Sequence, residues 1–180
     1  ALPRGCQVRC AVSDFNFASL AGLVTDEFAS TAAARISTSE AEQGQVAPGT
    51  GVAEAVFTAE YRTVRTANDL LTGATALASD IEPGTASGLK ALAFALKAEA
   101  LGEALQTYQK IPINTINVTQ PAYVSRSEAL PYVRALLDSV AAQITATAPS
   151  AFFNASILTP GVNLPNMVQL FRARYARIAN

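Results

Sequence analysis

The sequence predicts an all-α protein built as an array of antiparallel helices, and two features of the chain support this prediction. Apolar residues recur at steps of three and four along five segments, which is the spacing of one face of an α-helix. Half of the residues are apolar but only 7% are aromatic. Much of the apolar half is alanine, the residue with the highest helix propensity. No alternating apolar and polar segment is long enough to require a sheet.

Each of the five apolar stripes marks one expected helix. The first helix is expected within residues 12–35 and the second within residues 52–79. The third is marked by the stripe from Phe94 to Tyr108, the fourth by Val133 to Ile144, and the fifth by Leu164 to Ile178. With short connections, helices two to four would be antiparallel neighbours, as in the helix pairs of tetratricopeptide-like (TPR-like) repeats. An irregular helix bundle is the alternative.

The segments between the stripes contain residues that interrupt helices. DIEPGTASG, residues 80–88, is expected to separate the second and third helices because it contains proline and glycine. KIPINTINVTQPAYVSRS, residues 110–127, is expected to be a long loop with room for one short extended piece. Ser127 is the expected N-cap of the fourth helix, with Glu128 in its first turn and Pro131 near its start.

An asparagine occupies one position of the apolar stripe of the second helix. Phe57, Tyr61, Val64, Asn68 and Leu71 recur at helical spacing, and four of these five residues are apolar or aromatic. A buried amide requires hydrogen-bond partners, and the backbone of a neighbouring loop could supply them. We therefore interpret Asn68 as a structural residue that fastens a loop to the helix.

Charge and residue usage exclude several functional classes. Thirteen basic and fourteen acidic residues give a net charge of -1, so the basic stripe that nucleic-acid binding requires is missing. Because the chain has no histidine, a Ser-His-Asp triad and a Cys-His pair are excluded. We expect a protein that is not an enzyme, with no cofactor, no catalytic residues and no metal ligands. Cys6 and Cys10 are interpreted as small apolar side chains.

No Asp, Glu, Lys or Arg occurs between Asp138 and Arg172. A segment of this length could cross a bilayer, since about 20 apolar residues suffice. Three prolines and several amides and hydroxyls interrupt the segment, however. We therefore expect a helix end followed by a loop that lies on the protein, and no transmembrane segment.

Four segments, in chain order, resemble the N-terminal half of SusD/RagB-type outer-membrane proteins: LAGLVTDEF, EYRTVRTANDLL, KALAFALKAEALGEALQTYQKIPI and VSRSEALPYVRALLDSVAAQI. The family pattern combines an Asp-Glu pair, a Tyr followed by Ala-Asn and Leu, a Tyr followed by a Pro, and an Arg-Ser helix entry with a later Asp. The matching residues are Asp26, Glu27, Tyr61, Ala67, Asn68, Leu71, Tyr108, Pro112, Arg126, Ser127 and Asp138. LPNMVQLFRARYARIAN is similar to a helix near the middle of the family.

The resemblance implies a location and a function. Residues 1–180 would form a single helical domain, the N-terminal part of a longer protein in the Gram-negative cell envelope, at the outer-membrane surface or in the periplasm. The protein would capture a nutrient, such as an oligosaccharide, beside a TonB-dependent outer-membrane transporter. The alternative is a helical scaffold or interaction subunit that joins another envelope protein and has no small-molecule ligand. The motifs do not decide between these two readings.

If the chain binds sugar, the 110–127 segment is the expected place, because long loops in compact domains are often functional. Tyr123 is the expected stacking platform. The amides of Asn114, Asn117 and Gln120 are the expected hydrogen-bond donors and acceptors. The alternative is that this loop packs along the helices without binding a ligand.

Overall fold

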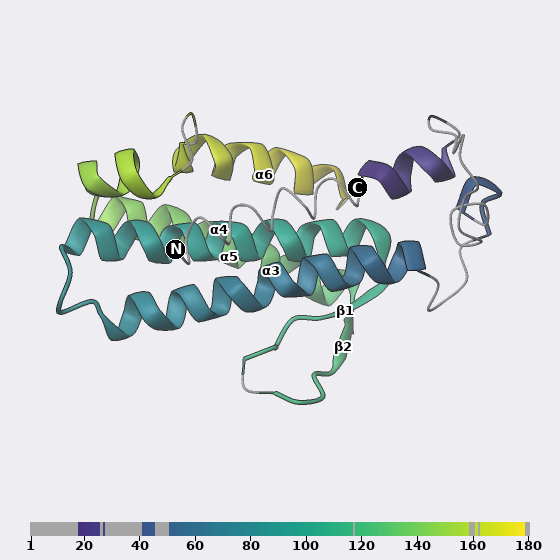
Figure 1. Ribbon diagram of the computed structural model, residues 1–180, viewed down its shortest axis with the longest axis horizontal. Coiled ribbons are helices and arrows are strands. Elements are labelled where there is room, and N and C mark those ends of the chain that lie inside the picture. The colour runs from purple at the N-terminus through teal and green to yellow at the C-terminus, as the bar shows by residue number, and fades with distance from the viewer. Residues whose placement is uncertain are drawn as a thin grey trace.

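The described part of the chain is an array of helices that run side by side (Figure 1). The computed structural model describes residues 18–25, 27, 41–45, 51–116, 118–158, 161 and 163–178. The main helices are α3 (Gly51–Ala76), α4 (Pro83–Thr107), α5 (Arg126–Ala146) and α6 (Leu164–Ile178). Two short strands, β1 (Lys110–Pro112) and β2 (Tyr123–Ser125), are the only strands among these residues. The predicted all-α antiparallel array is therefore confirmed.

The apolar stripes placed α3 and α6 within a few residues of their ends, whereas α4 and α5 begin well before their stripes. α3 begins at Gly51 and ends at Ala76, close to the expected 52–79, and α6 has the bounds of its stripe. Within the first expected helix, 12–35, residues 18–24 are helical and most of the others lie outside the described residues. Leu20 of that helix packs with Ala41 and with Val56 of α3 in a small cluster beside the main core.

α4 lies at the centre of the array because it packs against α3, α5 and α6. Buried residues therefore occur on all sides of α4. The sequence indicated only one buried face, the stripe from Phe94 to Tyr108. Phe94 is itself only half-buried, while Leu92 and Leu96 are fully buried. Lys97 is also buried, and its ammonium nitrogen lies 5.5 Å from the centre of the Tyr132 ring of α5. This cation–π contact gives the buried charge a partner.

α4 begins within the segment that was expected to be a loop, so the prediction for residues 80–88 is wrong from Pro83 onward. Proline is well tolerated in the first helical turn, where its missing N–H has no helical partner to lose. The two glycines serve close packing. A Cβ atom on Gly84 would lie 2.8 Å from the carbonyl oxygen of Ala148, and one on Gly88 would lie 2.6 Å from the ring of Phe153. Phe153 begins the short π-helix η1 (Phe153–Ile157), which follows α5.

The connection between α4 and α5 is a hairpin, where the sequence suggested one extended piece. β1 and β2 pair antiparallel with Lys110 opposite Ser125 and Pro112 opposite Tyr123. Residues 113–116 and 118–122 belong to the loop between the strands. The hairpin projects on the side of the array opposite to α6 (Figure 1).

The N-cap of α5 is Ser125, so the expectation of Ser127 is wrong by two residues. Ser125 and Glu128 have the Ser-x-x-Glu spacing of a capping box. The backbone N–H of Ser125 donates to Glu128 Oε2 at 2.9 Å, and the Ser125 hydroxyl donates to the same oxygen at 2.7 Å. Pro131 lies inside the helix, beyond the first turn.

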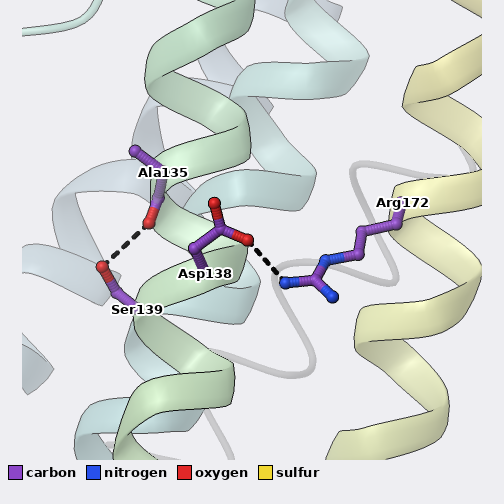
Figure 2. A network of polar contacts seen from close by, with 4 residues as sticks. All are labelled: Ala135, Asp138, Ser139 and Arg172. Carbon is purple, nitrogen blue, oxygen red and sulfur yellow. Dashed lines mark hydrogen bonds and ion pairs between the residues drawn. The ribbon is translucent and has the colours of Figure 1, made fainter.

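The charge-free segment leads from α5 through η1 to α6, which packs back on α4 and α5. Leu164, Val168 and Phe171 are the buried side chains of α6. Arg172 of α6 extends to Asp138 of α5 (Figure 2). None of the helices in the described part of the chain combines the length and the apolar character that crossing a bilayer requires.

Candidate functional site

A polar groove of about 960 Å³ lies between α3 and the loop that joins β1 to β2. Its lining residues on α3 are Tyr61, Arg65, Asn68, Asp69, Thr72 and Gly73, and those on the loop are Thr115, Ile116, Val118 and Thr119. One wall is therefore a rigid helix and the other an irregular segment. Hydroxyl, amide, guanidinium and carboxylate groups all reach the groove, which is the range of groups that hydrogen-bonds to a polar ligand.

The helical wall follows from the spacing of polar residues on α3. Tyr61, Arg65, Asn68 and Thr72 recur at steps of four, three and four, which places them on one side of the helix. The core-facing side carries a different set, which includes Val64, Ala67 and Leu70. Asn68 therefore lies where the groove side of α3 meets its core side.

Arg65 and Asp69 give the groove one positive and one negative side chain. Both are exposed and lie four residues apart on α3. The sequence places Arg65 and Asp69 one helical turn apart, yet no ion pair is found between these two described side chains. One positive and one negative side chain give the groove little net charge, and both groups can hydrogen-bond to a ligand. This arrangement suits a neutral polar ligand better than an ion.

Asn68 connects the two walls of the groove. Its side chain is 8% exposed, and its Nδ2 donates to Thr115 Oγ1 at 3.1 Å. The sequence interpretation placed a buried amide here that fastens a loop to the helix. The partner is a threonine hydroxyl of the loop, where a backbone group was expected. This bond holds the loop against α3 near the middle of the groove.

At one end of the groove, aromatic residues fix the base of the hairpin to α3. The Tyr61 hydroxyl donates to the carbonyl oxygen of Pro112 at 2.8 Å. The ring of Phe57 stacks on that of Tyr61 at 4.4 Å and meets Tyr108 edge to face at 5.5 Å. The Tyr108 hydroxyl donates to the carbonyl oxygen of Ala53. Burial raises the pKa of Tyr61 far above its ordinary value of 10, and the nearby Tyr123 raises it further.

These contacts account for several residues of the family resemblance. Tyr61, Tyr108 and Pro112 belong to the cluster that holds the hairpin. Arg126 is the first residue of α5, and Asp138 pairs with Arg172. Each of these residues has a structural contact or position, so they account for how the helices and the hairpin are held together and do not identify a ligand.

Three of the four residues proposed from sequence to bind sugar, Tyr123, Asn114 and Gln120, lie outside the lining of the groove. Tyr123 is 59% exposed, and the strand register places it opposite Pro112, beside Tyr61. Asn114 and Gln120 are exposed on the loop but are absent from the lining. Asn117 lies outside the described residues. The loop contributes Thr115, Ile116, Val118 and Thr119 in their place.

The sequence analysis missed Arg65, Asp69 and Thr72. Their spacing of four and three residues was a visible signal, since it indicates one helix face. A polar face on a helix normally contacts solvent, however, and no pattern in the sequence indicated that a loop some fifty positions further along would cover it. No group of three His, Cys, Asp or Glu side chains suited to a metal occurs among the described residues.

Comparison of this chain with protein-family models, with curated proteins and with solved structures finds no match in any of the three. By its fold and its groove, the described part of the chain is a helical protein with a polar surface groove.

Proposed function

We propose that this protein is a non-enzymatic binding protein that holds a neutral oligosaccharide in the groove between α3 and residues 113–122. The observation that carries the proposal is the lining of the groove, where Arg65, Asp69 and Asn68 lie together with three threonines. Sugars present hydroxyls that both donate and accept hydrogen bonds. A groove of about 960 Å³ has the size of a site for a ligand of several rings.

The aromatic residues support the same ligand class. The faces of a sugar ring carry C–H groups, which pack against aromatic rings. Tyr123 has an exposed ring beside the Tyr61 end of the groove. We propose that Tyr123 stacks on a sugar unit that extends out of the groove. Following the resemblance, the bound sugar would be passed to a TonB-dependent transporter in the outer membrane of the cell envelope.

Calorimetric titration with a panel of neutral oligosaccharides of three to eight units tests this proposal. Arg65→Ala should weaken binding by about tenfold or more, since a hydrogen bond to a charged group contributes about 1.5–3 kcal/mol. Arg62→Ala is the matched control, because Arg62 is an exposed arginine of the same helix that does not line the groove. Tyr123→Ala should also weaken binding. The proposal fails if no sugar binds, or if Arg65→Ala and Arg62→Ala bind equally well.

A helical scaffold is the second candidate, and the exposed apolar side chains of the loop favour it. Ile116 and Val118 are 45% and 40% exposed, and Tyr123 is close to them in the chain. Adjacent exposed apolar residues are typical of protein contacts. On this reading Ile116→Asp would abolish retention of the protein by envelope membranes, while Arg65→Ala would not affect it. If Ile116→Asp leaves membrane retention unchanged while Arg65→Ala weakens sugar binding, the sugar site is favoured.

A further inference from the structure

The amide of Asn68 has one end without a hydrogen-bond partner. Nδ2 donates to Thr115 Oγ1, whereas Oδ1 has no partner among the described residues and exposes less than 1 Å². Unsatisfied buried acceptors are rare in folded proteins, because each loses its hydrogen bonds to water without gaining a partner. A fastening role explains the bond to Thr115, but it does not explain the carbonyl oxygen.

Rotating the Asn68 amide by half a turn would not give both of its ends a hydrogen-bond partner. An asparagine side chain presents an acceptor at one end and donors at the other, and the two ends can be exchanged by rotation. Thr115 has one hydroxyl, which can bond to one end only. Whichever end faces Thr115, the other end remains available to a third group.

The position of the amide indicates where that third group comes from. Asn68 lines the groove, one helical turn from Arg65 and from Thr72. The Thr115 oxygen accepts the Asn68 bond, and its hydroxyl proton has no acceptor among the described residues. An acceptor and a donor therefore lie next to each other on opposite walls of the groove.

We propose that Asn68 and Thr115 together bind a pair of neighbouring hydroxyl groups on the ligand, which extends the proposed function and rests on it. One ligand hydroxyl donates to Asn68 Oδ1, and its neighbour accepts from the Thr115 hydroxyl. Because Oδ1 exposes less than 1 Å², the loop must shift slightly to admit the ligand, while the bond from Asn68 Nδ2 to Thr115 Oγ1 is kept. The site thereby selects neutral ligands with vicinal hydroxyls, and the pairing of the amide becomes complete only in the complex.

The test compares Asn68→Leu with Thr115→Val, with Thr72→Val as the control for a groove threonine outside the pair. Melting temperature and affinity for the oligosaccharide panel are measured for each variant of the full chain. Asn68→Leu should weaken sugar binding at least tenfold while the melting temperature stays unchanged or rises, because the change removes an unsatisfied acceptor together with the bond. Thr115→Val should melt at a lower temperature than Asn68→Leu, because it leaves the whole buried amide without a partner. Thr72→Val should keep the wild-type melting temperature.

Two results would overturn the assignment. Sugar binding by Asn68→Leu at wild-type affinity would remove the residue from the site. A fall in melting temperature of about 4 °C or more in Asn68→Leu, equal to that in Thr115→Val, would show that the amide only fastens the loop.

A second set of probes, short uncharged peptides of two to four residues, separates this inference from the proposed function. Peptide amides also present neighbouring donors and acceptors. If the wild-type chain binds these peptides but no sugar, and Asn68→Leu abolishes that binding, the oligosaccharide function and the selection of vicinal hydroxyls fail, while the role of Asn68 as a ligand-binding residue stands. If the wild-type chain binds neither probe, both proposals fail.

Discussion

Arg172 and Asp138 form an ion pair that joins α6 to α5, with Nη2 of the arginine 2.5 Å from Oδ1 of the aspartate (Figure 2). The same two residues border the segment that contains no charged side chain. Asp138 lies in the middle of α5, which continues to Ala146. The chain then turns through η1 and returns along α6, so that Arg172 lies beside Asp138. The segment between them is held by packing of apolar groups and by hydrogen bonds to other helices, such as the 2.7 Å bond between Ser150 and Thr85 of α4.

The ion pair should contribute little to stability compared with the apolar contacts beside it. Arg172 and Asp138 are 48% and 72% exposed, and solvent-exposed pairs contribute about 0–1 kcal/mol. Phe171 is buried, and truncation of a buried phenylalanine costs about 3–5 kcal/mol. Urea unfolding should therefore show a small loss in the free energy of unfolding for Arg172→Ala and a large loss for Phe171→Ala. A loss from Arg172→Ala as large as that from Phe171→Ala would contradict this expectation.

Gly88 should not tolerate alanine, although alanine is the better helix former. An added Cβ atom would lie 2.6 Å from the ring of Phe153, and overpacking of a core costs about 1–3 kcal/mol. This exceeds the gain of roughly 1 kcal/mol in helix propensity. Gly73→Ala in α3 is the matched control, because a Cβ atom there would meet nothing within 4 Å. Thermal melts should show Gly88→Ala below the wild type and Gly73→Ala above it.

The start of α5 should weaken at acid pH. Hydrogen bonds from the Ser125 hydroxyl and backbone N–H lower the pKa of Glu128 from its ordinary value of 4.5. The carboxylate therefore stabilises the fold above that value, and the contribution is lost as the pH falls through the lowered pKa. Melting temperatures of wild type and Glu128→Gln should converge between pH 6 and about pH 3. Glu54→Gln, in the first turn of α3, serves as the control, and an identical pH profile for all three proteins would disprove the prediction.

Tyr61→Phe should loosen the hairpin from α3. The change removes the bond from the Tyr61 hydroxyl to the Pro112 carbonyl oxygen, and we expect a loss of about 0.5–1.5 kcal/mol in the free energy of unfolding. Tyr132→Phe keeps the ring that contacts Lys97 and should be nearly neutral. Faster hydrogen exchange at residues 110–112 in Tyr61→Phe alone would support the expected detachment.

Tyr61 also predicts a loss of stability in alkali. Because burial raises its pKa above 10 in the folded state, the unfolded chain ionises first as the pH increases. The contribution of the neutral phenol is therefore complete below pH 10 and declines above it. Denaturant unfolding between pH 9 and about pH 11 should show a steeper decline for the wild type than for Tyr61→Phe. Parallel curves would argue against a buried neutral phenol at this position.

The helices were predictable because their signal is local. The stripe from Leu164 to Ile178 has the bounds of α6, and the stripe around Tyr61 lies within α3. Each stripe depends only on the 3.6-residue period of the helix, which relates residues one turn apart. One error was local, since the N-cap of α5 is Ser125, which has the capping-box spacing to Glu128. The other came from proline and glycine, whose local preference predicts a loop at residues 80–88. Gly84 and Gly88 instead lie in α4, where Ala148 and Phe153 leave no room for a Cβ atom.

By itself, the sequence determined the helical class, the position of the main helices, and the presence of an amide on the apolar stripe of α3. Only the tertiary structure decided that this amide faces a groove. Asn68 and Thr115 are 47 positions apart, and no local pattern relates residues at such a separation. The bond from Tyr61 to Pro112 and the pairing of β1 with β2 set the path of the loop. That path places Thr115 against Asn68, and it turns the exposed polar face of α3 into one wall of a site.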